Sequence, residues 1–196
     1  MSISRSKTVG RSNRKLPSFR LPATVSRTAL LEAGCDRRFR QLVYDLFTIS
    51  VRMETVRTRL ARRIGITGPQ YSVLVAIAQF QGIDGVSVGK VAQVLHVSAA
   101  FITAETRQLE RLGLVVKGIN PHDRRGVLLR LAPTGEQQMI AITPAITAVN
   151  DRFFASLSRK AFRSFADCAA QLVSSSREVI QSIETASAGH TVQAAE

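Results

Sequence analysis

The side chains best suited to acid–base or metal chemistry are scattered along this sequence. His96, His122 and His190 stand far apart, and Cys35 and Cys168 have neither metal-ligand spacing nor the pattern of a disulfide framework. The sequence holds no Ser/His/Asp or Cys/His arrangement and no phosphate-binding glycine loop. We therefore expect no catalytic residue, no metal and no cofactor. The two cysteines are interpreted as reduced thiols, with a redox-sensor role as the alternative.

Cationic chemistry is concentrated instead in one short polar segment, residues 120–126. It holds Asp123, Arg124 and Arg125 between two apolar runs. An arginine at a hairpin tip suits the minor groove of DNA, where a narrow groove concentrates negative potential. An acid would repel phosphates there, so we expect Asp123 to pair with Arg125 and to orient it. The alternative is an ordinary charged turn with a solvated ion pair.

A second set of candidate residues lies on a helix predicted from Ser98 to Leu112. Its inward face, and the core residues that it meets, are Ile102, Thr106, Leu109, Leu112, Val91, Leu95 and Val97. Its outward face consists of Ser98, Ala99, Ala100, Thr103, Ala104 and Arg107. Small side chains let a helix approach base edges in the major groove, methyl groups suit thymine, and hydroxyls bond bases or phosphates. The alternative is a smooth surface face that binds nothing.

Periodicity and caps predict the elements that position these residues. We expect helices over residues 36–64, 67–81, 87–95, 98–112, 136–157 and 158–186, with strands over 114–116 and 127–131. His96 and Val97 form a tight turn between two short helices, and Pro144 should kink the fifth helix. The first helix carries a long apolar stripe: Phe39, Leu42, Val43, Leu46, Phe47, Ser50, Met53, Val56 and Leu60. Two short helices followed by a basic hairpin predict a winged helix-turn-helix, in a fold that is mainly α.

The composition of the chain indicates which classes of binding partner it favours. The chain has 196 residues, 45% of them apolar, and a net charge of +13, which favours nucleic acid first and an anionic membrane second. No apolar run is long enough to span a bilayer, so we expect no membrane insertion. The first 30 residues contain no acidic residue. Their seven basic residues are Arg5, Lys7, Arg11, Arg14, Lys15, Arg20 and Arg27. We interpret this segment as a flexible basic arm that tracks phosphates or only solubilises the chain, with a transit peptide as the alternative.

The stretch LHVSAAFITAETRQLERLGLVVKGINPHDRRGVLLRL, residues 95–131, resembles the DNA-binding core of the MarR family of bacterial transcription regulators. Its most specific part is the pattern N-P-x-D-x-R-G-V-L, and ITGPQYSVL (residues 66–74) resembles the family's second helix. The order of elements agrees over about residues 36–183. The resemblance implies a cytoplasmic homodimer, built from the first and last helices, that binds double-stranded DNA at a near-palindromic operator. It also implies that Asp123 orients the wing arginine, Arg125.

The implied organisation is a basic arm (1–30), a first dimerisation helix (31–65), a winged helix-turn-helix domain (66–135), C-terminal dimerisation helices (136–186) and a frayed tail (187–196). Family members often respond to small anionic or phenolic compounds, so the function implied is a ligand-responsive repressor. The effector would be a small aromatic or anionic molecule, or an acyl-coenzyme A thioester. A pocket between the first, second and fifth helices would be lined by Phe47, Ser50, Met53, Arg57 and Tyr71, for which ordinary core packing is the alternative.

Two features depart from the family pattern. A subgroup senses peroxide through a cysteine in the first helix, but Cys35 lies about two turns early and Val43 is near the expected place. The basic arm is also long for the family. The alternative function is an architectural or RNA-binding protein without sequence readout, although the scarcity of aromatic residues argues against single-strand recognition.

Overall fold

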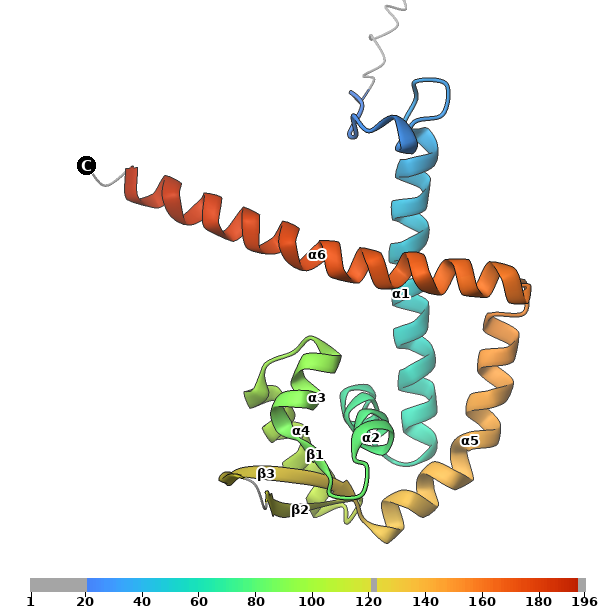
Figure 1. Cartoon of the computed structure of the whole chain (residues 1–196). Coiled ribbons are helices and arrows are strands. Elements are labelled where there is room, and N and C mark those ends of the chain that lie inside the picture. The colour runs from blue at the N-terminus through green and yellow to red at the C-terminus, as the bar shows by residue number, and fades with distance from the viewer. Residues whose placement is uncertain (1–20, 121–122, 194–196) are drawn as a thin grey trace, which may run out of the picture. The chain divides into compact units, whose positions relative to one another are not determined.

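The computed structural model describes residues 21–120 and 123–193, with side chains described for 21–120 and 126–186. The chain forms two compact units, residues 1–54 and 55–196. The helices are η1 (Thr28–Leu30), α1 (Arg37–Arg63), α2 (Gly68–Phe80), α3 (Val88–Leu95), α4 (Ala99–Arg111), α5 (Pro133–Phe153) and α6 (Arg159–Gln193), coloured in chain order in Figure 1. The strands are β1 (Val86–Ser87), β2 (Val115–Asn120) and β3 (Asp123–Leu131). The mainly helical architecture with a small β-sheet is as predicted.

In the first unit, hydrogen bonds hold the segment from Thr24 to Asp36 just before α1, and we call this segment the hook. The buried Asp36 accepts hydrogen bonds at Oδ2 from the backbone N–H of Thr24 (2.7 Å) and from its hydroxyl (2.9 Å), and Oδ1 lies 2.8 Å from Arg40. Glu32 and Cys35 exchange backbone hydrogen bonds across a two-residue turn. Residues 1–20 of the predicted arm lie outside the described part of the chain. Within the predicted flexible segment up to residue 30, Thr24 makes these contacts, and the flexibility of the arm stays a prediction.

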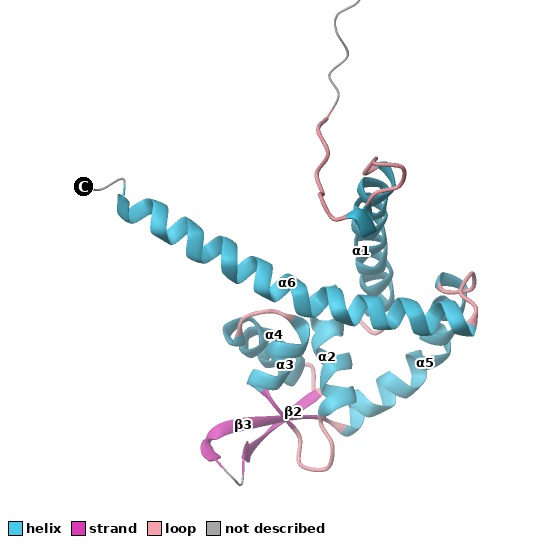
Figure 2. Ribbon diagram, turned by 45° about the horizontal axis from the view of Figure 1, so that its top comes forward, coloured by secondary structure: helices cyan, strands magenta, loops and turns pink. Residues whose placement is uncertain are grey.

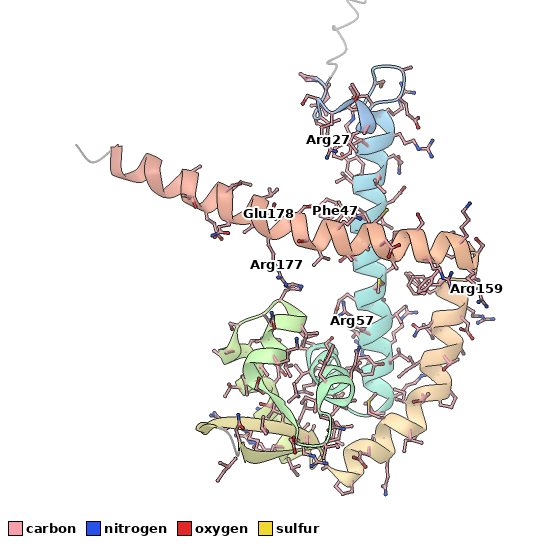
Figure 3. The ribbon with its side chains drawn as sticks, in the orientation of Figure 1. Arg27, Phe47, Arg57, Arg159, Arg177 and Glu178 are labelled. Atoms are coloured by element: carbon pink, nitrogen blue, oxygen red, sulfur yellow. The ribbon has the colours of Figure 1, made fainter. Side chains whose placement is uncertain are left out.

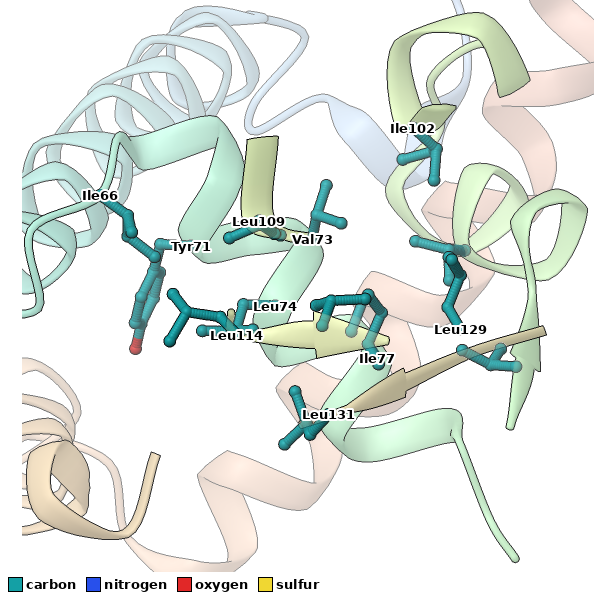
Figure 4. Packing of buried hydrophobic residues seen from close by; sticks show 14 of the residues in the cluster. Ile66, Tyr71, Val73, Leu74, Ile77, Ile102, Leu109, Leu114, Leu129 and Leu131 are labelled. Carbon is teal, nitrogen blue, oxygen red and sulfur yellow. The ribbon is translucent and has the colours of Figure 1, made fainter. Parts of the chain in front are cut away.

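The second unit contains the winged helix-turn-helix. Its sheet has the strand order β1-β3-β2, and all of its pairs are antiparallel. Figure 2 shows the strands (magenta) beside α2, α3 and α4, with which the sheet is in contact. Leu74, Ile77, Ile102, Leu109 and Leu129 are fully buried between these helices and the sheet (Figure 4).

Local signals start α2 and α6 where the sequence predicts, whereas α5 begins at Pro133, three residues before its predicted start. Thr67 forms a capping box with Gln70: the Thr67 hydroxyl accepts from the Gln70 backbone N–H, and the Gln70 side chain accepts from the Thr67 N–H. Ser158 accepts from the backbone N–H of Ala161 at the start of α6. Pro144 lies inside α5, and Figure 1 shows that this helix bends along its length. The last helix continues to Gln193, past the position where fraying is predicted.

The hairpin departs from its predicted length. β2 and β3 extend into the predicted polar turn as far as Asn120 and Asp123, which lie opposite each other in the register. β1 is a strand that the sequence does not predict, since its two residues are extended by pairing with β3 about 40 positions later. The side chain of Gln81, at the end of α2, accepts a hydrogen bond from the backbone N–H of Leu131 (2.7 Å) and ties that helix to the sheet.

Two predicted core residues are wrong. Leu112 is 54% exposed and Val97 is also exposed. α4 ends at Arg111, and Gly113 follows with a φ of +69°, which reverses the chain. Leu114 then occupies the core position that the helical period assigned to Leu112.

Candidate nucleic-acid interface

The two helices of the helix-turn-helix are set by a pair of serine caps. The Ser87 hydroxyl accepts from the backbone N–H of Lys90 (3.2 Å), and the Ser98 hydroxyl accepts from that of Phe101 (3.1 Å). His96 ends α3 in a left-handed conformation, with φ 53° and ψ 44°. This single residue makes the tight turn that allows α4 to leave α3 at an angle, as the sequence predicts.

Helix α4, the predicted recognition helix, has one buried and one exposed face. Ile102, Thr106 and Leu109 are fully buried, and the Thr106 hydroxyl donates to the carbonyl of Ile102 (2.8 Å), so this polar group is satisfied in the core. All of the predicted DNA-facing residues of this helix are exposed: Ser98, Ala99, Ala100, Thr103, Ala104 and Arg107. Their contact with DNA stays a prediction, but the structure places them together on one accessible face.

Thr103 lies in the middle of this face. Its hydroxyl donates to the carbonyl of Ala99 (2.9 Å) inside the helix, so the side chain is held in one rotamer. The hydroxyl oxygen can still accept a hydrogen bond from a base, and the methyl group remains available for a thymine methyl.

The wing is described in its backbone but not at its tip. The side chains of Asp123, Arg124 and Arg125 lie outside the described residues, so the predicted pairing of Asp123 with Arg125 stays a prediction. The register of the hairpin shifts between Ile119 and Asn120. Such an irregularity locally bends a strand and re-aims the residues that follow it.

Sequence reasoning missed an ion pair between α4 and the wing. The Lys117 ammonium on β2 lies 2.7 Å from a carboxylate oxygen of Glu110, in the last turn of α4. The two residues are seven positions apart and belong to different elements, so helical periodicity does not connect them. Their opposite charges on either side of Gly113 were the one available signal.

The second unit contains a cavity of about 140 Å³ between the end of α1, α2 and α3. Its walls are Arg57, Tyr71, Ser72, Val75, Ala76, Gln79, Phe80, Val94 and Leu95. Arg57 Nη1 lies 3.4 Å from the Ser72 hydroxyl. Burial raises the pKa of the Tyr71 phenol, and the positive charge of Arg57 opposes that rise. A cation, a phenol and a hydroxyl therefore face an otherwise largely apolar space.

Two of the five predicted pocket residues, Arg57 and Tyr71, line this cavity. Phe47, Ser50 and Met53 belong to the first unit, where they are exposed on α1, and Phe47, labelled in Figure 3, is 67% exposed. The walls of the cavity come from α3 rather than α5. The effector role of all five residues stays a prediction.

Other chemistry is sparse among the described residues. They contain no cluster of three or more His, Cys, Asp or Glu side chains able to hold a metal ion. Both Cys35 and Cys168 are exposed free thiols. None of the described helices is both long and apolar enough to cross a membrane.

Comparison with known proteins assigns the family. The model of the MarR family matches residues 64–126, which run from the end of α1 to the wing. The transcriptional regulator HosA of Escherichia coli O111:H- is 32% identical over 93 residues, covering 47% of this chain and 67% of that protein. The chain belongs to the MarR family. The matched segments of two other curated relatives span only about half of their lengths, 55% and 52%.

Solved structures agree with this winged helix-turn-helix fold. The MepR–DNA complex of S. aureus has a TM-score of 0.58 at 21% identity, covering 67% of this chain and 95% of that one. CouR from Rhodococcus jostii RHA1, bound to p-coumaroyl-CoA, has a TM-score of 0.61 at 22% identity, covering 67% and 90%. At these identities the likeness concerns the fold, which this MarR-family chain shares over about two thirds of its length.

Proposed function

We propose that this MarR-family protein is a transcription regulator that binds double-stranded DNA with sequence specificity. The observation that carries the proposal is the two-sided character of α4. Ile102 and Leu109 anchor one side in the core, while the small residues around Thr103 are exposed on the other. A helix so anchored presents a rigid, narrow surface to the major groove. The hairpin contains Arg124 and Arg125, and an arginine of the wing suits the adjacent minor groove.

Charge supports a nucleic-acid partner. The net charge of +13 attracts phosphates and supplies affinity that falls with salt. Charge alone does not read sequence, so the recognition face and the charge have separable roles. MepR of S. aureus, which has a similar fold, forms a complex with DNA.

We propose further that the protein acts as a homodimer. α6 carries an apolar stripe at alternating steps of three and four residues: Phe162, Phe165, Ala169, Leu172, Ser176, Val179 and Ile183. α1 repeats the same spacing with Phe39, Leu42, Leu46, Ile49, Met53, Val56 and Leu60. Each stripe spans about 21 residues, or roughly 31 Å of helix. Most of the large apolar side chains of both stripes are exposed in the single chain.

Such surfaces mark an interface, because a helix with an apolar stripe gains stability only by burying it. A second copy supplies a matching stripe of equal length. Two copies would carry two recognition helices, which accounts for the predicted near-palindromic operator.

A ligand-responsive repressor is the second part of the proposal, and the cavity beside Arg57 and Tyr71 supports it. A guanidinium and a phenol next to apolar walls suit an aromatic carboxylate. The volume of about 140 Å³ is below the roughly 300–1,000 Å³ of a drug-sized site. A small acid therefore fits better than a whole acyl-coenzyme A thioester, whose nucleotide part would remain outside. CouR, bound to p-coumaroyl-CoA, shows the larger ligand in a protein of this fold.

The experiment that tests the DNA proposal is selection of bound sequences from a random duplex pool. We expect recovery of a near-palindrome, and loss of its selective binding in Thr103→Asp, because an acid on this face repels the base edges and phosphates. Arg152→Ala, an exposed cation in the last turn of α5, serves as a matched control that retains selectivity. Equal affinity of the wild-type protein for selected and random duplexes would support the architectural or RNA-binding alternative instead.

The effector proposal is tested by thermal unfolding with hydroxybenzoates and with their thioesters. A ligand that binds the native state raises the melting temperature. We expect stabilisation by an aromatic acid in the wild-type protein and less in Arg57→Met. Equal shifts in both proteins would place the ligand elsewhere.

A further inference from the structure

The wing loses its support from the helical core at Lys117. Along β2, Val115 is fully buried opposite Leu131, and Lys117 lies opposite the fully buried Leu129. Two positions further, Ile119 on the same face of the strand is 77% exposed. Because alternate residues of a strand share a face, these three positions trace the edge of the core. Lys117 lies at the position where the hairpin extends beyond the core.

Lys117 is held at this edge by the recognition helix. Its ammonium lies 2.7 Å from Glu110, and the two side chains are 28% and 43% exposed. The aliphatic part of a lysine can cover apolar surface while its charged end reaches a partner. The side chain therefore links the last turn of α4 directly to the base of the wing.

Glu110 is otherwise unfavourably placed for a DNA-binding helix. It lies in the last turn of α4, where the negative end of the helix dipole opposes an acid. It also adds negative charge to the helix that is proposed to approach a polyanion. An acid at this position is explained if its bond to Lys117 contributes more than its charge costs.

We infer that Glu110 and Lys117 form a strut that sets the angle of the wing relative to α4, so that both reach DNA at the same time. This inference rests on the proposed DNA-binding function. The two residues are positioning residues, since neither needs to touch a base. A wing held in advance loses less conformational freedom on binding than a wing that pivots. The next residue, Gly118, has open space around it and adds no packing that would replace the strut.

The direction in which one substitution changes the DNA affinity distinguishes the strut from simple electrostatics. Glu110→Gln removes a negative charge, so electrostatics alone predicts tighter binding to every duplex. The strut predicts weaker binding to the selected sequence, by roughly two- to five-fold, because an exposed ion pair contributes up to about 1 kcal/mol. Binding to random duplex should tighten slightly. The ratio of the two affinities is therefore expected to fall.

Glu105→Gln is the matched control, because it removes the same charge from the same helix. We expect it to tighten both kinds of binding, without a loss of the ratio. The exchanged pair Glu110→Lys with Lys117→Glu keeps the net charge and should recover most of the selective binding. If Lys117 acted by contacting a phosphate itself, the exchanged pair would stay weak and the strut would be wrong.

A double-mutant cycle with the wing shows whether the strut acts through it. In an Arg124→Ala, Arg125→Ala background, Glu110→Gln should no longer weaken binding to the selected duplex, because the wing makes no contact to be positioned. An unchanged loss in that background would overturn the inference. The inference would also be overturned if Glu110→Gln tightened binding to the selected duplex as much as Glu105→Gln does. If the wild-type protein selects no sequence at all, the proposed function fails first, and the failure is visible before any variant is made.

Discussion

The winged helix-turn-helix and the long helices differ in where their apolar side chains go. In the former, Leu74, Ile102 and Leu129 are completely buried within one chain. On α6, every large apolar residue of the described stripe is exposed, and in residues 21–54 of the first unit no apolar residue is fully buried. The winged helix-turn-helix therefore has its own core, whereas the apolar stripe of α6 is left exposed in the single chain. This difference predicts that substitutions in the two regions will respond differently to protein concentration.

The largest effect is expected from the self-contained core. Leu74→Ala should lower the free energy of unfolding by about 2–5 kcal/mol, because it leaves a cavity among fully buried neighbours. The measurement is denaturant unfolding at several protein concentrations. The loss should be similar at each of them, since this core lies within one chain. A loss that disappears at high concentration would contradict the comparison.

The next effect is expected on α6. Leu172→Asp, in the middle of its stripe, should weaken dimerisation by about 2 kcal/mol or more, because the charge would be buried without a partner in the interface. Sedimentation or light scattering against concentration measures it. Gln171→Asp, on the adjacent exposed position, is the control and should leave the dimer intact. Equal behaviour of the two variants would mean that the stripe is not the interface.

The comparison also explains which features could be predicted from the sequence. Helix starts at Thr67, Ser87 and Ser98 depend on residues three positions apart, and the structure confirms them. β1 was missed because a two-residue strand exists only through its distant partner β3. Leu112 was misplaced because helical period says nothing of the reversal at Gly113. Local signals set the elements, while contacts between elements decide where they end.

The candidate site shows the same division. The outward face of α4 follows from helical period, so its exposed residues were named correctly. The Lys117–Glu110 pair and the position of Arg57 beside Ser72 depend on how different elements meet. Neither contact could be found from spacing along a single element.

The prediction for the wing sharpens the comparison on the side of the winged helix-turn-helix. Arg125→Ala should weaken binding to the selected duplex by roughly 1–3 kcal/mol. It should leave the dimer unchanged, because the wing arginine is proposed to contact DNA and not the second protomer. A DNA titration and a sedimentation run on the same sample check both points. Unchanged affinity would refute the assignment of the wing arginine.

Arg107→Ala, on α4, should instead weaken binding to many sequences and flatten the salt dependence of binding.

The smallest effect is expected at the hook, which polar contacts hold in the absence of a fully buried apolar residue. The backbone N–H of Thr24, its hydroxyl and the nearby Arg40 keep the pKa of Asp36 below its ordinary value. The hook is therefore favoured while Asp36 is ionised. Its contribution should be fully present above the ordinary aspartate pKa, near 4, and lost as the pH falls through the lowered value. Hydrogen exchange of the Thr24 amide between pH 6 and acid conditions measures this change.

Asp36→Asn separates the charge from the hydrogen bonds. The amide oxygen can still accept from Thr24, but it does not titrate and it attracts Arg40 less. We expect faster exchange of the Thr24 amide in this variant near neutral pH, without the additional acid transition of the wild type. If both proteins show the same transition, another group opens the hook. Because α2 to α4 have their own core, their melting temperature should stay unchanged, so that the hook and the winged helix-turn-helix respond separately.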